Sequence, residues 1–271
     1  MSYTEKEIKN QIVEKYEEKF GKKTDRGYLR KPEENLVKIF SNWAEIKKEL
    51  EDGNGKELEE KFLAIHSSSA LCVNNLAPFK VLKEYENSIF HDAVFEQKLP
   101  TKLRGTPPHL DFYLENADTI IGFESKFTEY FEKKIDHTKK NLGKYFMRKE
   151  LDYLPNSFEF LISHYKNCTS KMHLDVAQLI KHSIGLINNK KNKKATLVYI
   201  FWEPMNWEKI EICKQHRKEI CDFATRIEQY KDIITFESLS YIDFWGKYEN
   251  NKLLKEYIQL VKDRYCFEIV K

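Results

Sequence analysis

Three charged side chains near the middle of the chain have the types and spacing that suit a metal-dependent reaction at a phosphate. Glu124 and Lys126 lie two residues apart in the apolar run "DTIIGFESKFTEYF", and Asp111 precedes them in "PHLDFYLE". Charges buried in a strand cost free energy unless something compensates them. Two carboxylates suit Mg²⁺, which keeps several waters and takes further oxygens from a substrate phosphate. A lysine beside such a metal can position the attacking water or stabilise the charge that develops on phosphate.

The two segments that carry these charges are predicted to form an antiparallel hairpin. With a tight turn at Asn116-Ala117, Asp111 would lie opposite Gly122 on the neighbouring strand. Opposed residues share a face of the sheet, and side chains alternate along each strand. We therefore expect Asp111, Glu124 and Lys126 on one face, with Gly122 leaving room beside them.

Three further polar residues could approach this group. Glu96, in the preceding predicted strand "VFEQKL", is a candidate third acid that would complete the metal shell through a water, although an exposed strand charge explains it equally well. Gln178 and His182 lie four residues apart on one face of a predicted helix. They are candidates to contact substrate phosphate or to orient Lys126. A helix cap and a histidine at the edge of the core account for them equally well.

The surrounding pattern predicts one α/β domain, a mixed sheet flanked by helices, over residues 1–271. Residues 1–90 are mainly helical, 91–204 hold the core strands and a helix, and 205–271 are mainly helical. The strands are expected at 92–100, 108–115, 119–127 and 195–204. The helical stretches are expected at 5–20, 32–51, 55–86, 137–154, 173–191, 211–230 and 251–265.

Composition excludes several classes of protein. Hydrophobic residues make up 41% of the 271 residues and aromatics 14%, which is typical of a globular chain and not of a disordered one. No apolar stretch approaches the roughly 20 residues of a membrane span. The five cysteines include no CxxC pair, which argues against a zinc site and fits reduced thiols. We therefore expect a soluble cytoplasmic protein with no membrane partner.

An aspartate followed in the next strand by Glu-x-Lys, each in apolar sequence, resembles the PD-(D/E)XK motif of the restriction-endonuclease-like nuclease superfamily. The motif reads 108–111, "PHLD", and 124–126, "ESK", with extra residues between the proline and the aspartate. The resemblance extends, from about residue 58 to the C-terminus, to a bacterial branch of restriction-type nucleases. The segments that carry it are "HSSSALCVNN", "FEQKLP", "GTPPHLD", "ESKFTE", "QLIKHSIG" and "LVYIFWEP".

This resemblance implies a restriction-endonuclease-like core and metal-dependent cleavage of a nucleic acid, with DNA as the expected partner. Asp111 and Glu124 would bind Mg²⁺, for which Mn²⁺ can substitute, Lys126 would position the water, and Glu96 would be auxiliary. A homodimer is left open. Lysine-rich segments at 132–150 and 188–194 could neutralise phosphates, or could be solvated faces of the protein.

Two other interpretations stay open. Glu-x-Lys alone carries little weight, because it recurs at 7–9, 17–19, 45–47, 59–61, 96–98 and 132–134. The chain could be a nucleic-acid-binding protein with a nuclease fold but no cleavage activity. It could also be an unrelated α/β protein in which the charges merely pair with one another.

Overall fold

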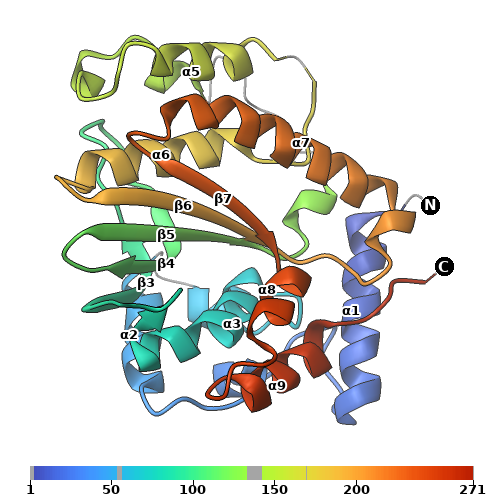
Figure 1. Ribbon diagram of the computed structural model, residues 1–271. Coiled ribbons are helices and arrows are strands. Elements are labelled where there is room, and N and C mark those ends of the chain that lie inside the picture. The colour runs from blue at the N-terminus through green and yellow to red at the C-terminus, as the bar shows by residue number, and fades with distance from the viewer. Residues whose placement is uncertain (1–2, 54–56, 133–141, 169, 271) are drawn as a thin grey trace.

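The fold is a five-stranded mixed sheet with helices on both faces, as Figure 1 shows. The computed structural model describes residues 3–53, 57–132, 142–168 and 170–270. The strand order is β3-β4-β5-β6-β7, in which β3, β4 and β5 are antiparallel neighbours and β6 and β7 run parallel to β5. The strands are β3 (Asp92–Lys98), β4 (His109–Glu115), β5 (Thr119–Lys126), β6 (Lys194–Phe201) and β7 (Thr235–Ser240). The predicted fold class is confirmed.

The most apolar strands occupy the interior of the sheet. β5 is the middle strand, and its residues 120–125 are all buried. β6 pairs on both sides and is buried over its last five residues. Strands covered on both faces read as nearly continuous hydrophobic runs, which is the pattern of "ATLVYIF". Glu124, near the end of β5, therefore lies in the middle of the sheet.

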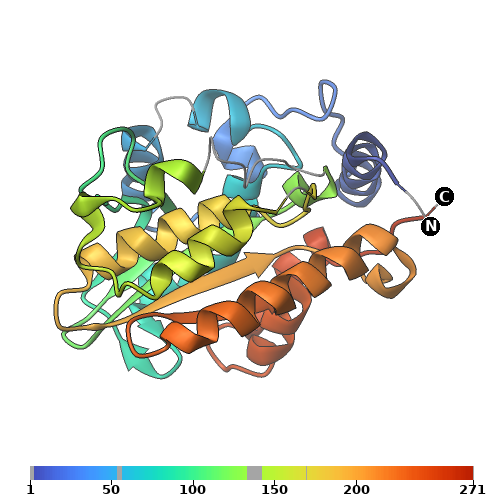
Figure 2. The same ribbon diagram turned by 90° about the horizontal axis from the view of Figure 1, so that it is seen from above.

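Two layers of helices cover the sheet. One face carries α6 (Val176–Asn189) and α7 (Glu211–Ile227), with α5 (Phe158–Lys166) packed outside them, and in Figure 2 these helices run alongside β6. The other face carries α2 (Trp43–Asp52), α3 (Ser68–Leu82), α8 (Tyr241–Tyr248) and α9 (Lys255–Tyr265). α1 (Glu5–Phe20) joins that second core through Ile8, Ile12 and Tyr16.

The ends of several helices follow from local capping. Thr4 and Glu7 form a capping box at the start of α1, and Gly21 ends that helix with a left-handed φ of 61°. α6 begins where the Asp175 side chain accepts a hydrogen bond from the Gln178 N–H. Asp175 thus fixes where α6 begins. Within the described residues, no helix combines the length and the apolar character needed to cross a membrane.

The N-terminal helical region is more broken than predicted. Residues 32–51 form a short turn, η1 (Pro32–Asn35), and then α2, with irregular chain between them. The buried Asn35 explains the break, because its side-chain amide donates to the Ala64 carbonyl at 2.8 Å and its own carbonyl accepts from Asn74. The 55–86 stretch contains a π-helical turn, η2 (Glu57–Lys61), then α3 from Ser68, where Ser67 caps the helix, and ends in the short strand β1 (Glu84–Tyr85). These polar contacts to distant segments replace helical hydrogen bonds.

The predicted helix at 137–154 is wrong where it can be compared. Residues 142–154 contain only the short turns η4 (Gly143–Tyr145) and η5 (Lys149–Leu151), while 133–141 lie outside the described residues. α5 and α8 were not predicted. The other predicted helices correspond to α1, α6, α7 and α9, and all four predicted strands are present.

The hairpin of β4 and β5 turns one residue later than expected. Asn116 pairs with Thr119, and its side-chain oxygen accepts hydrogen bonds from the N–H groups of Asp118 and Thr119 at 3.0 and 2.8 Å. The register therefore shifts by two residues, and Tyr113 instead of Asp111 lies opposite Gly122. A shift of two leaves the faces of β5 unchanged, because side chains alternate with period two.

The space beside Gly122 is filled by a leucine. The expectation that this glycine leaves room beside Asp111, Glu124 and Lys126 is therefore wrong. A Cβ on Gly122 would lie 2.3 Å from Leu110 Cδ1 and 3.2 Å from Leu110 Cγ. Leu110 is fully buried in the core on the α6 face. The glycine lets this leucine lie against β5 immediately before Asp111.

We predict that Gly122→Ala lowers the free energy of unfolding by about 1–3 kcal/mol, because Leu110 must leave its rotamer. Gly246→Ala is the matched control: this exposed position in α8 has open space around it, and alanine should leave stability unchanged or raise it by roughly 0.5–1 kcal/mol. Urea unfolding followed by circular dichroism measures both. Equal midpoints for Gly122→Ala and wild type would contradict the packing described here.

Candidate active site

Glu124 is a buried carboxylate whose charge is balanced by two neighbours. It is 1% exposed; its Oε1 forms an ion pair with Lys126, and its Oε2 lies 2.9 Å from His182 Nε2. Burial works against ionisation, but the charge of Lys126 and the contact with His182 outweigh it and hold the pKa of Glu124 at about 2. Glu124 is therefore ionised at neutral pH.

Lys126 is the cation of the site. Burial alone would lower its pKa, but the carboxylates of Glu124, Glu129 and Asp111 together raise it well above the ordinary value. The Lys126 side chain stays 14% exposed. It is thus protonated at neutral pH and is a hydrogen-bond donor that still reaches solvent.

Asp111 lies where the two strands separate. The ladder between β4 and β5 ends at Phe112 and Phe123, and just beyond it Asp111 Oδ2 accepts the Ser125 N–H at 2.6 Å. The carboxylate thus accepts a hydrogen bond that a main-chain oxygen of β4 would accept if the ladder continued. Burial, followed by the charge of Glu124, raises the pKa of Asp111 well above its usual range, while Lys126 opposes the rise. The structure thus brings the three predicted residues together.

Glu96 lies at the edge of this group. It has a left-handed φ of 54° inside β3, and its Oε2 is 3.7 Å from His109 Nδ1. It also lies against Gly53, where an added Cβ would come within 3.2 Å of Oε2. Its charge contributes to the raised pKa of Asp111. Its role as an auxiliary metal ligand stays a prediction.

The donor set at the site suits magnesium. In the described part of the chain, no three His, Cys, Asp or Glu side chains are grouped closely enough to enclose a metal. Asp111 and Glu124 offer two carboxylates, which is enough for a cation that retains waters and takes substrate oxygens. Burial and then repulsion from Glu124 raise the pKa of Asp111, and a bound cation would relieve the repulsion. Zinc, in contrast, is held by Cys and His ligands.

The two candidate residues on α6, His182 and Gln178, have different surroundings. His182 faces the sheet from α6, is 1% exposed and contacts Glu124. Among the described atoms, neither of its ring nitrogens makes a hydrogen bond of regular geometry. Gln178 lies one turn earlier and is half-buried, and its backbone N–H donates to Asp175 Oδ1 at 3.0 Å. Contact of either residue with substrate phosphate stays a prediction.

Two helices that are distant in sequence, α8 and α3, also contact residues of the site. The sequence analysis did not predict these contacts. Ser125 Oγ lies 2.8 Å from the hydroxyl of Tyr241 in α8. Cys72 in α3 is buried beside them, and its pKa is raised by burial and then by the charges of Asp111, Glu96 and Glu124. Ser125 and Tyr241 are 116 residues apart, and no local pattern indicates that they meet.

Comparison with known proteins gives one result. Residues 5–266 match a family described as Restriction Endonuclease associating with ARP, or REase-ARP. The chain belongs to this family. No curated protein and no solved structure matches it. The REase-ARP match runs from α1 to the end of α9, so it includes Asp111, Glu124 and Lys126 as well as the first fifty residues, which the sequence resemblance left out.

We predict that Lys126→Met lowers the free energy of unfolding by about 3–5 kcal/mol, because it leaves the buried Glu124 carboxylate without the cation that balances its charge. Glu124→Leu combined with Lys126→Met should recover most of this loss, since the buried Glu124 carboxylate is removed together with the cation that balances it. Thermal and urea unfolding measure the coupling. Lys15→Met, which breaks the exposed pair with Glu18, is the control and should cost less than about 1 kcal/mol. A Lys126→Met protein as stable as this control would contradict the account.

Proposed function

We propose that the protein is a Mg²⁺-dependent nuclease that hydrolyses phosphodiester bonds, acting on DNA as an endonuclease of restriction type. The observation that carries the proposal is the grouping of Asp111, Glu124 and Lys126 where β4 and β5 separate, in a chain of the REase-ARP family. Family membership alone supports a nuclease of restriction type. The residues of the site supply the proposed metal dependence and the chemistry.

In this proposal Asp111 and Glu124 hold the cation, and Mn²⁺ can substitute for Mg²⁺. When bound, such a cation neutralises charge on the phosphate and acidifies a coordinated water. Lys126 is protonated, so it donates a hydrogen bond to the attacking water or to a phosphate oxygen. His182 acts through Glu124, because its Nε2 lies 2.9 Å from Oε2. Ser125 orients Asp111 in the same way, through its backbone N–H.

Asp111→Asn is expected to lower the rate of DNA cleavage at saturating Mg²⁺ by at least about 100-fold, because one of two charged ligands is lost while shape is kept. The substitution also removes a buried charge that repels Glu124, so the protein should stay folded. Asp232→Asn, at an exposed position, is the control and should cleave at the wild-type rate. The measurement is single-turnover cleavage of plasmid and single-stranded DNA. Cleavage by Asp111→Asn at the wild-type rate would refute the assignment.

Direct metal titration separates cleavage from the alternative, a nuclease-fold protein that only binds nucleic acid. Our proposal predicts that calorimetry detects Mg²⁺ or Mn²⁺ binding to wild type and to Asp232→Asn, and that Asp111→Asn loses it. A protein that binds DNA but shows no metal binding dependent on Asp111 would favour the non-catalytic alternative.

A further inference from the structure

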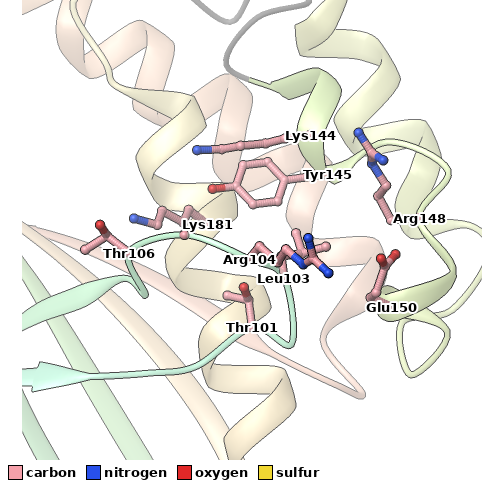
Figure 3. A pocket seen from close by; sticks show the side chains of 10 residues that line it. Thr101, Leu103, Arg104, Thr106, Lys144, Tyr145, Arg148, Glu150 and Lys181 are labelled. Carbon is pink, nitrogen blue, oxygen red and sulfur yellow. The ribbon is translucent and has the colours of Figure 1, made fainter.

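A basic pocket lies next to the carboxylates but is separate from them. Its volume is about 250 Å³, and it is formed by the loop that joins β3 to β4, the turns η4 and η5, and α6. Figure 3 shows the side chains that surround it. Those that matter here are Arg104, Lys144, Tyr145, Arg148, Glu150 and Lys181.

The β3–β4 loop is held in place at its base. The Leu99 N–H donates to the Pro108 carbonyl at 2.9 Å and closes the loop. Asn188 and Asn189, at the end of α6, donate to the Pro100 carbonyl at 2.8 and 2.9 Å. The Tyr153 hydroxyl donates to the Thr101 carbonyl at 3.1 Å. The wall that carries Arg104 is therefore tied to α6 and to the segment after η5.

The approach of α6 to this loop also depends on a glycine. A Cβ on Gly185 would lie 2.8 Å from Pro108 Cγ and 3.0 Å from Leu99 Cβ. Gly185 lies one turn after Lys181 in α6. The close contact brings Lys181 up to the loop, so one helix contributes both to the pocket and, through His182, to the carboxylate site.

The charge of the pocket is strongly unbalanced. Four cationic side chains line it against a single carboxylate, that of Glu150. Among the described residues, no ion pair joins any of these four cations to an acid. Lys144 Nζ lies 5.1 Å from the centre of the Tyr145 ring, and burial raises the pKa of Tyr145, so its hydroxyl stays a donor. The pocket thus presents hydrogen-bond donors and excess positive charge.

Lys181 in α6 interacts electrostatically with both the pocket and the carboxylate site. Burial and the charge of Lys144 lower the pKa of Lys181, while Glu124 opposes this fall. Lys181 also acts on His109, the residue that contacts Glu96. Lys181 therefore lies within range of both the basic pocket and the acidic site.

We propose that this pocket binds a phosphate group of the nucleic-acid strand other than the one that is cut. The proposal rests on the proposed function for its choice of a nucleic acid as ligand. Arginine guanidinium groups bind phosphate oxygens with two parallel hydrogen bonds, and Arg104 and Arg148 line one pocket. Lys144, Lys181 and the Tyr145 hydroxyl add donors that an anion can accept from. A single acidic residue makes the pocket a poor site for a cation.

The occupant is a phosphate of the strand, either an internal phosphodiester or a terminal phosphate. The test uses the double variant Arg104→Ala/Arg148→Ala in the full chain, without metal, so that no cleavage interferes. Fluorescence anisotropy measures the Kd for oligonucleotides that carry either a 5′-phosphate or a 5′-hydroxyl, over a range of salt concentrations. The control, Lys218→Ala/Lys252→Ala, removes two charges from exposed positions away from the pocket.

We expect the pocket variant to raise Kd by at least about tenfold and to reduce the slope of log K against log salt by roughly 0.7–0.9, which corresponds to one lost phosphate contact. The control should bind like wild type. If an internal phosphate occupies the pocket, both oligonucleotides lose affinity equally in the variant. If a terminal phosphate does, only wild type prefers the phosphorylated oligonucleotide. Equal Kd values and salt slopes for variant and control would overturn the proposal.

Cleavage assays then separate this inference from the function on which it rests. If wild type cuts DNA and the pocket variant binds and cuts like the control, the pocket assignment fails alone. If wild type does not cut under any metal condition but the pocket variant still loses oligonucleotide affinity, the nuclease proposal fails and the phosphate pocket stands.

Discussion

The ionised carboxylate of Glu124, in the middle of the sheet, is the constraint on which the arrangement around the site depends. An unmatched buried charge costs several kcal/mol, which is comparable with the whole stability of a domain. The fold meets this cost with Lys126 on the same strand and with His182 from α6. Each partner has to be held in place, so the packing of α6 on β5 and the end of the ladder are tied to this one charge.

The sheet departs from regular geometry at the same place. The ladder between β4 and β5 stops before Asp111, and Glu96 takes a left-handed φ inside β3. For a residue other than glycine such a conformation costs of order 1–3 kcal/mol. Leu110 packs against β5 only because Gly122 has no Cβ. Departures of this kind concentrate at functional sites, where geometry is selected over stability.

The two proposals describe one surface with opposite charges at its two ends. In these proposals Asp111 and Glu124 form an acidic end that binds a cation, and the Arg104 pocket forms a basic end that binds a phosphate. A nucleic-acid strand with a metal ion satisfies both. α6 connects the two ends, because consecutive residues, Lys181 and His182, serve one end each. REase-ARP membership and the site chemistry therefore support the same kind of substrate.

Sequence periodicity by itself determined the positions of β3, β4, β5 and β6, the mixed α/β class and the grouping of Asp111, Glu124 and Lys126. These follow from alternation and from two strands joined by a short turn, both of which are local. It failed where a side chain replaced main-chain partners: Asn116 shifted the hairpin by two residues, and Asn35 ended a predicted helix.

Only the tertiary structure decided which side chains face Glu124 and which line the basic pocket. His182 is 58 residues from Glu124, and Arg104 and Arg148 come from segments with no shared pattern. Such contacts depend on how the helical layers pack on the sheet. The reason is that side-chain packing and buried charge pairing act through space, whereas periodicity records only which face of its own element a residue occupies.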